Sequence, residues 1–396
     1  MTEDHFDGGL ANYLARVSRA LSSLGHIVHV ITLSFSDESV FEHQGVIIHR
    51  VMLRQGWNTL DRLTLRRLST TLRWLNLSAQ VHRKLKQLHR EVNFDLVQYP
   101  NYSFCGLFSI PLLPGKHLVR ASSYQPVLHA AGGFKPSIDA RAMELLEQLQ
   151  SRMSGNVFAP SCTLQNMLMT KGRLSKIKII RTPFYIETAD WDTSLYDQHL
   201  KNQKYLLYFG RFQMHKGFHT LVHALPKFLE QHSEARVVLV GRDIETVLAS
   251  SMVEYARDKC GRFADRLIVF NQLPHCLLYP IIEGAKIVAL PSLVDNTPNA
   301  CLEAMGLGKV VIGTRGTSLD ELITDGVNGF LVQPDSPEEL AEKLIAVWGD
   351  PHLQGIGAKA REITIRFSEE KTVESLLAYY REVLTRDHRK NHKQSA

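Results

Sequence analysis

The chain has 396 residues, of which 44% are hydrophobic and 22% charged, an ordinary globular composition and a length that suits two domains. No apolar run reaches the roughly 18 residues of a membrane-spanning helix, and the acidic N-terminus lacks the apolar segment of a secretory signal. Five scattered cysteines without CxxC spacing, and histidines that do not pair at ligand spacing, predict a reduced cytoplasmic protein without a metal site.

The net charge of +6 is concentrated in residues 50–90, which hold eight Arg and two Lys against one Asp. Leucines recur there at helical spacing, so residues 60–90 are predicted to form a basic amphipathic helix. Such a helix either rests on an anionic membrane surface or is a surface helix with a solvated basic face. Nucleic acid is not a predicted partner, because no known binding module accompanies the charge.

In the first half, apolar runs of strand length alternate with helical stretches. Strands are predicted at 26–33, 46–51, 94–99, 117–121, 157–159 and 177–180, and helices at 10–24, 140–152 and 161–171. This alternation is typical of a parallel sheet covered by helices on both faces. Residues 185–204 are polar and periodless, which indicates a linker between a first domain, 1–190, and a second, 191–396.

The second half repeats the pattern. Six strands are predicted at 205–209, 236–240, 267–270, 287–290, 310–313 and 330–332, with helices at 218–229, 244–258, 276–284, 300–307, 337–347 and 368–386, before a short disordered tail. Two consecutive doubly wound, Rossmann-like α/β domains follow, and ligands are expected at the carboxyl ends of their strands.

One strand–loop–helix unit, Leu290 to Val311, carries two acids eight positions apart. Asp295 lies in the loop and Glu303 about one turn into the helix. The first N–H groups of that helix, around Asn299 and Ala300, favour an anion, and a carboxylate such as Glu303 can accept two hydroxyl protons from a ribose. The pattern fits a nucleotide-sugar site, and it fits equally an ordinary unit in which Asp295 caps the loop and Glu303 is solvated.

The loop from Gly210 to Gly217 follows the first strand of the second half and carries Arg211 and Lys216. Arg211 can fork onto two phosphate oxygens and Lys216 adds a point charge, which favours a diphosphate site over a solvated loop. The loop is neither a Walker A motif, since His215 stands where glycine is needed, nor a GxGxxG fingerprint. Gly8 and Gly9 either open a helix that a phosphate or substrate could approach closely or form a flexible start to the chain.

Taken together, these motifs resemble the retaining GT-B glycosyltransferases of the group 1, family 4 type. The resemblance runs through GRxxxxKG at 210–217, LVGRD at 239–243, LPS at 290–292, LEAMGLGKVVIGT at 302–314 and ELITDGVNGFLV at 321–332. The first half is similar through 8–32 and 94–100. It implies two Rossmann-like domains facing a cleft, with the C-terminal helix packing back on the first domain.

The resemblance also implies an activity and a set of site residues. A sugar would pass from a nucleotide diphosphate sugar to an acceptor with retention of configuration, without a metal or cofactor. Arg211 and Lys216 match the diphosphate-binding pair, and Asp295 stands where the family usually has a Glu that contacts the donor sugar. Further matches are Glu303 at the donor ribose, the backbone of Asn299 and Ala300 at sugar or phosphate, and Gly9 at the glycine-rich loop near the donor phosphate and acceptor.

The chain departs from the family pattern at four places. Asp295 is one methylene shorter than Glu, and Asn296-Thr297-Pro298 replaces Gly-aromatic-Gly, a variant similar to that of polysaccharide-forming members. Residues 120–123 lack the histidine that many members carry, so no catalytic histidine is assigned. The strand implied just before Gly8 has no matching apolar run, which indicates a mis-assigned start or a truncated chain.

The expected acceptor is a lipid-linked or growing surface glycan, and the expected place is the cytoplasm, at the inner membrane face through residues 60–90. Two other functions stay open. One is a GT-B nucleotide-sugar epimerase, for which the sequence offers no clear acid/base set. The other is a non-catalytic scaffold that binds the nucleotide sugar without turnover.

Overall fold

A computed structural model describes residues 9–34, 37–54, 58–186, 191–296 and 298–394, and these form two compact units. The N-terminal unit takes the described residues among 5–126, 135–183 and 369–396, and the C-terminal unit takes 127–134 and the described residues of 184–368. The C-terminal unit begins a few residues before the boundary expected at 190. It ends at Ser368, so the last helix belongs to the N-terminal unit. The resemblance had implied that the C-terminal helix packs back on the first domain.

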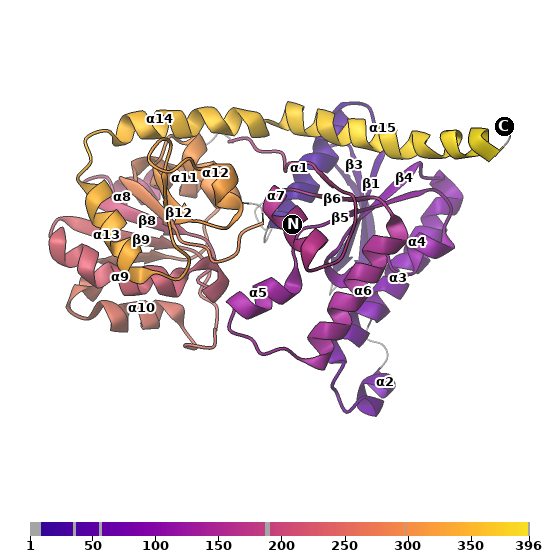
Figure 1. Ribbon diagram of the computed structural model, residues 1–396, viewed down its shortest axis with the longest axis horizontal. Helices are drawn as coiled ribbons and strands as arrows, with labels where there is room; N and C mark the ends of the chain where they lie inside the picture. The colour runs from indigo at the N-terminus through magenta and orange to yellow at the C-terminus, as the bar shows by residue number, and fades with distance from the viewer. Residues whose placement is uncertain (1–8, 35–36, 55–57, 187–190, 297, 395–396) are drawn as a thin grey trace. The chain divides into compact units, whose positions relative to one another are not determined.

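The C-terminal unit is built around one parallel six-stranded sheet of order β10-β9-β8-β11-β12-β13. Figure 1 labels β8, β9 and β12 of this sheet. Its strands are β8 (Lys204–Phe209), β9 (Ala235–Val240), β10 (Leu267–Phe270), β11 (Ile287–Leu290), β12 (Val311–Thr314) and β13 (Phe330–Val332). Its helices are α8 (Ser194–His199), α9 (Phe218–Gln231), α10 (Met252–Cys260), α11 (His275–Gly284), α12 (Asn299–Gly306), α13 (Pro337–Trp348) and α14 (Leu353–Thr364). This order is that of a doubly wound sheet, as predicted.

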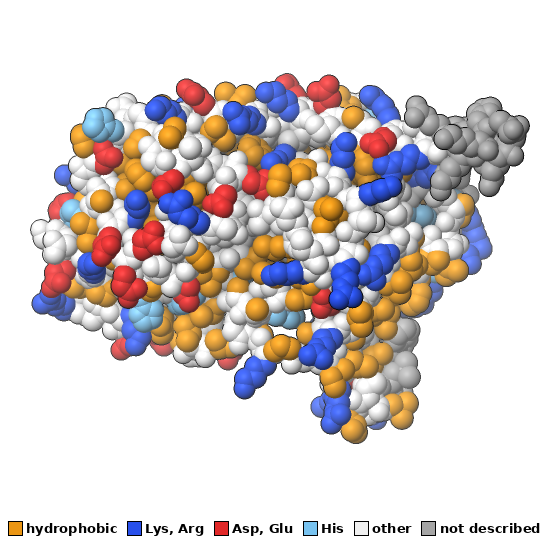
Figure 2. Space-filling view, in the orientation of Figure 1, with side chains coloured by type: hydrophobic (Ala, Val, Ile, Leu, Met, Phe, Trp, Pro, Cys, Tyr) orange, Lys and Arg blue, Asp and Glu red, His pale blue; other side chains and the backbone are white. Residues whose placement is uncertain are grey.

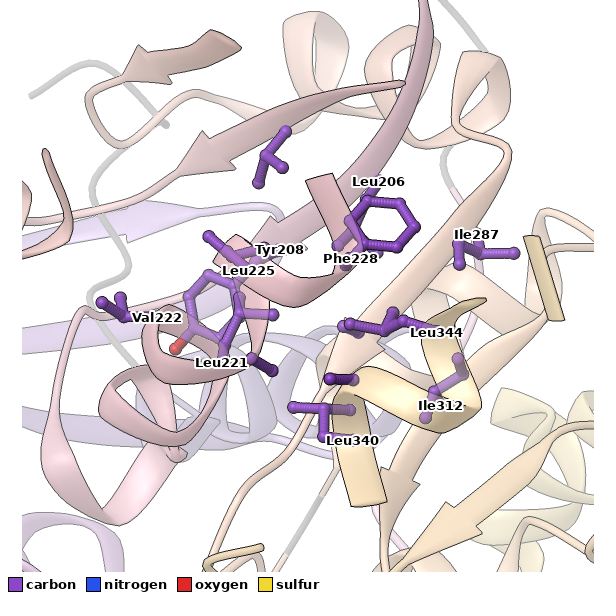
Figure 3. Packing of buried hydrophobic residues seen from close by; sticks show 14 of the residues in the cluster. Leu206, Tyr208, Leu221, Val222, Leu225, Phe228, Ile287, Ile312, Leu340 and Leu344 are labelled. Carbon is purple, nitrogen blue, oxygen red and sulfur yellow. The ribbon is translucent and has the colours of Figure 1, made fainter. Parts of the chain in front are cut away.

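Helices cover both faces of this sheet because successive strand residues point to opposite sides. Leu206 and Tyr208 of β8 pack with α9, α10 and α13, whereas Tyr205 and Leu207 pack with α11 and α12. Figure 3 shows the first of these clusters, in which side chains of α9 and α13 meet those of β8, β11 and β12. The strands are buried on both faces, which is why they appear in the sequence as continuous apolar runs.

The described residues of the N-terminal unit form two sheets, β1-β3-β2 and β4-β5-β6-β7. Its strands are β1 (Val28–Ser34), β2 (Ser39–His43), β3 (Val46–Met52), β4 (Leu96–Pro100), β5 (Lys116–Arg120), β6 (Val157–Ala159) and β7 (Ile177–Ile179). Its helices are α1 (Gly9–Ser23), α2 (Asn58–Leu63), α3 (Ser69–Val92), α4 (Ser109–Leu112), α6 (Ile138–Ser154), α7 (Cys162–Thr170) and α15 (Glu369–Gln394), while α5 (Gln125–Ala131) passes from this unit into the other.

The C-terminal helix α15 is part of the core of the N-terminal unit. Leu376, Tyr379 and Val383 pack with Tyr13 of α1 and Phe158 of β6. The helix runs to Gln394, through residues for which the sequence indicated a disordered tail. The strand that the resemblance implies before Gly8 falls on residues 1–8, outside the described part of the chain.

Candidate functional site

The candidate site lies where the strand order of the C-terminal sheet reverses. β8 and β11 are neighbours and run parallel, but their following helices, α9 and α12, pack on opposite faces. The loops after the two strands, 210–217 and 291–298, therefore leave the same edge of the sheet side by side, and such a switch point is where doubly wound domains bind ligands. Both loops were singled out in the sequence.

Backbone contacts hold the 210–217 loop in place. Tyr208 donates its hydroxyl hydrogen to the Arg211 carbonyl over 2.8 Å, and the Phe212 amide donates to the Arg242 carbonyl over 3.0 Å. Phe212 is fully buried, whereas the Arg211 side chain beside it is exposed. The loop thus anchors its backbone inside the unit and leaves the guanidinium at the surface, where it can meet an anion.

An ion pair and two backbone bonds join the two loops. Lys216 Nζ lies 2.9 Å from Asp295 Oδ2, and the Asp295 side chain is only 10% exposed. The amides of Leu293 and Val294 both donate to the His215 carbonyl, over 2.9 and 3.2 Å. Lys216 and Asp295, which are 79 positions apart in the sequence, therefore lie side by side. A ligand that binds between the two loops could contact both.

Glu303 lies one turn inside α12, and its side chain is 8% exposed. Its carboxylate lies 3.6 Å from the Nε2 atom of His275, which begins α11 and stacks on Tyr279 with ring centroids 4.9 Å apart. A carboxylate is rarely this buried unless it is paired, so the interpretation of Glu303 as a solvated surface acid is wrong. Asn299 and Ala300, the first two residues of α12, are half-buried.

The arrangement can bind an anion next to a polyol. The cations Arg211 and Lys216 and the N-terminus of α12 supply positive charge, and the buried carboxylate of Glu303 supplies hydrogen-bond acceptors. Lys216 has three N–H donors, so it can keep its bond to Asp295 while donating to a second oxygen. Asp295 thereby fixes the position of the Lys216 ammonium.

Sequence reasoning missed three polar side chains of this region. His275 is the partner of Glu303, yet no spacing in the sequence relates the two residues. Gln213 Oε1 and Ser318 Oγ are buried and lack a hydrogen-bond partner within the described residues. The Ser318 amide donates to the Asp295 carbonyl over 3.3 Å, which places the loop after β12 against the loop after β11.

Gly9 begins α1 in the N-terminal unit, so its expected role near the donor phosphate stays a prediction. Thr297, which is part of the variant loop, lies outside the described residues. Within the described ranges, no three His, Cys, Asp or Glu side chains gather in a way that could hold a metal ion. No helix in that part of the chain is both long and apolar enough to cross a membrane.

His215 is expected to make the folding stability of the protein depend on pH. Burial, with the cations of Lys216 and Arg211, lowers the pKa of His215 to about 4, against the opposing influence of Asp295. Because the folded pKa lies below the ordinary value of 6.5, the unfolded chain binds more protons between these values, and stability falls as pH drops from 6.5 to 4. His215→Gln should remove up to about 3 kcal/mol of this fall, measured by urea unfolding at several pH values.

The matched control for this pH test is His26→Gln, because the His26 side chain is exposed. It should leave the pH dependence unchanged. If His215→Gln and His26→Gln give the same pH profile as the wild type, His215 is not held in its neutral form.

Two Rossmann-like α/β units are the architecture of the GT-B class of glycosyltransferases. Residues 203–350 match the family described as glycosyl transferases group 1, and residues 7–187 match glycosyltransferase family 4. The chain therefore belongs to the group 1, family 4 glycosyltransferases. The resemblance drawn from its motifs is confirmed.

Relatives found by sequence and by structure match most of the chain. An uncharacterized glycosyltransferase of Methanocaldococcus jannaschii is 24% identical over 365 residues, which is 86% of each chain. The structure of sucrose-phosphate synthase from Thermosynechococcus elongatus matches with a TM-score of 0.78 at 19% identity, covering 96% of this chain and 94% of that one. Anabaena HepE, solved in complex with UDP-glucose, matches with a TM-score of 0.70 at 18% identity, covering 95% and 97%.

Proposed function

We propose that this glycosyltransferase moves a hexose from a nucleotide diphosphate sugar to a lipid-linked or growing surface glycan, with retention of anomeric configuration. The observation that carries the donor assignment is the pairing of Lys216 with Asp295 beside the buried Glu303, on the two loops at the switch point. The UDP-glucose held by the HepE structure, which shares the fold, supports a nucleotide-sugar donor.

Each site residue has a role that follows from its chemistry. Arg211 and Lys216 bind the diphosphate, and the first amides of α12, at Asn299 and Ala300, add hydrogen bonds to phosphate or sugar. Glu303 accepts hydrogen bonds from the ribose hydroxyls. Asp295 holds Lys216 through Oδ2 and offers Oδ1 to a hydroxyl of the donor sugar.

The reaction builds negative charge on the departing diphosphate while the sugar becomes oxocarbenium-like. Lys216, Arg211 and the α12 N-terminus are placed to stabilise that charge in the transition state. The acceptor attacks from the face that the diphosphate leaves, and a leaving phosphate oxygen takes the acceptor proton. This scheme needs no protein nucleophile, metal or cofactor, and it gives retention.

The proposals for the acceptor and the cellular location rest on sequence composition and on the free cysteines. The Asp-Asn-x-Pro-Asn loop at 295–299 resembles that of polysaccharide-forming relatives. Cys105, Cys260, Cys276 and Cys301 are free thiols, which supports a reducing, cytoplasmic setting. The exposed basic side chains within the segment 60–90 support electrostatic contact with the inner membrane surface, where a lipid-linked acceptor would be found.

The donor site is tested by thermal and urea unfolding with UDP, GDP, ADP, dTDP and CMP. One nucleotide at about 100 times its dissociation constant should stabilise the wild type by roughly 2.7 kcal/mol. Glu303→Ala should lose this stabilisation, because the ribose hydroxyls lose their acceptor. Glu283→Ala removes the same charge from an exposed position of α11 and should keep it.

Turnover separates the proposed reaction from its alternatives. With the stabilising nucleotide sugar and an acceptor glycan, the product should carry the anomeric configuration of the donor, as read by NMR coupling constants. Nucleotide binding without any product would indicate a scaffold, and a changed donor sugar in the absence of acceptor would indicate an epimerase. If the nucleotide stabilised the wild type and Glu303→Ala equally, Glu303 would not be part of the donor site.

A further inference from the structure

The outer side of α6 carries a line of exposed apolar side chains, which we call the α6 stripe: Ile138, Leu145, Leu149 and Met153. They are 61%, 64%, 44% and 37% exposed. Their spacing of seven, four and four residues places them on one side of the helix. The opposite side, with Met143, faces the core of the N-terminal unit, so the stripe is not needed to hold the helix in place.

A second apolar element lies at the N-terminal end of the α6 stripe. The connection between α2 and α3 exposes Leu63 (75%) and Leu65 (76%), and we call residues 62–67 the α2–α3 corner. Asp139 of α6 accepts hydrogen bonds from the amides of Thr70 and Thr71 over 3.0 and 2.9 Å, which joins the starts of α3 and α6. The corner and the stripe are therefore neighbouring parts of one unit (Figures 1 and 2).

The charges around this apolar surface are mainly positive. Arginines at the corner and along the outer side of α6 are exposed: Arg62, Arg66, Arg67, Arg141 and Arg152. Figure 2 shows hydrophobic side chains along α6 with Lys and Arg side chains beside them.

Three of the acids near this surface accept hydrogen bonds from other groups of the N-terminal unit, and a fourth is buried. Asp139 binds the start of α3, and Asp61 accepts the Ser69 hydroxyl hydrogen over 2.7 Å. Glu144 accepts the Tyr124 hydroxyl hydrogen, also over 2.7 Å. Glu147 is buried, and burial raises its pKa to about 8. The five exposed arginines thus outnumber the acids along the apolar line.

We propose that the α6 stripe and the α2–α3 corner together dock on an anionic lipid bilayer. Exposed leucines enter the headgroup boundary while arginines meet the lipid phosphates, which is how apolar surfaces with a cationic border bind membranes. A second copy of the chain fits this surface poorly, because two-fold pairing would bring the arginines of one copy onto those of the other.

This surface differs from the basic helix predicted from sequence. The leucine-rich side of α3 is buried, with Leu77, Val81, Leu85 and Leu88 between 2% and 8% exposed, so that side packs inside the unit and cannot enter a bilayer. Only the corner at residues 62–67 belongs to the segment expected from sequence to meet a membrane. The remaining contact comes from α6, whose role the sequence did not indicate.

The docking is tested by co-sedimentation of the full chain with vesicles of phosphatidylcholine, with and without phosphatidylglycerol. We expect binding that requires phosphatidylglycerol and weakens with added salt. Leu145→Glu and Leu149→Glu should each weaken binding roughly tenfold or more, because each removes one apolar side chain from the boundary. Ile27→Glu is the matched control, since Ile27 is 80% exposed in the same unit but is not part of the surface.

Several outcomes would overturn the proposal: binding that ignores phosphatidylglycerol, or Leu145→Glu and Ile27→Glu variants that bind alike. A dimer in sedimentation equilibrium that Leu145→Glu dissociates would assign the surface to a second copy instead. Unchanged thermal unfolding of each variant shows that it folds. Nucleotide stabilisation, measured on the same variants without vesicles, reports on the proposed donor site separately, so failure of one assignment is distinguishable from failure of the other.

Discussion

Lys216→Met is expected to lower kcat for sugar transfer by roughly 10²–10³-fold, the cost of removing one donor aimed at developing charge. The methionine keeps the apolar stem of the side chain and removes the ammonium that pairs with Asp295 at 2.9 Å. Asp295 is only 10% exposed, so the variant also leaves this carboxylate without its cation. Initial rates over a range of donor and acceptor concentrations measure the effect.

The control for this variant is Lys227→Met, which removes an exposed ammonium of α9 that pairs with Glu342 across the surface. It should transfer sugar like the wild type, because exposed ion pairs contribute little. If Lys216→Met keeps kcat and raises only KM, Lys216 binds the donor in the ground state and does not act in the transition state.

Gly217→Ala is expected to lower the free energy of unfolding by about 3 kcal/mol or more. Gly217 has φ of +67°, and a Cβ atom there would stand 1.7 Å from the Pro291 carbonyl oxygen. The two switch-point loops touch at this glycine, so relief of the clash must separate them. Urea unfolding measures the loss of stability, and nucleotide stabilisation should fall in the same variant.

Gly326→Ala isolates the backbone contribution to that loss. Gly326 has φ of +76° with nothing within 4 Å of the added carbon, so only the left-handed backbone is penalised, by about 1–2 kcal/mol. Equal losses for the two variants would mean that the close approach of the loops contributes nothing to stability.

The architecture could be predicted from sequence where strands are buried on both faces. All six strands of the C-terminal unit appear as apolar runs, because their residues have core on either side. The antiparallel strand β2 was missed, since most of it is exposed and it carries no such run. The linker expected at 185–204 contains the short helix α8, whose Tyr196 packs into the second core cluster.

Tertiary contacts explain the remaining differences. α14 was missed because Gly355 and Gly357 weaken its helical pattern, yet a Cβ at Gly357 would stand 2.0 Å from the Gly308 carbonyl oxygen, so close packing requires the glycine. The helix predicted from Ile244 begins only at Met252, where Asp243 accepts hydrogen bonds from the Met252 amide and the Ser251 hydroxyl.

The two site loops were found from local chemistry, but their contact was not. Whether Lys216 meets Asp295 depends on β8 and β11 being neighbours, and the sequence alone does not give strand order. The same holds for Glu303 and His275, which come from helices that follow different strands. Motifs thus name the residues of a site, whereas topology decides which of them touch.

The two ends of the segment 184–368, which forms most of the C-terminal unit, lie together. The Phe184 amide donates to the Phe367 carbonyl over 2.9 Å, and Phe184 forms a parallel bridge with Ser368. When the two ends of a folded segment lie close together, the segment can be inserted into or removed from another chain without distorting the flanking residues. The segment 184–368, which makes up the C-terminal unit except for residues 127–134, is therefore a suitable piece to exchange between related chains.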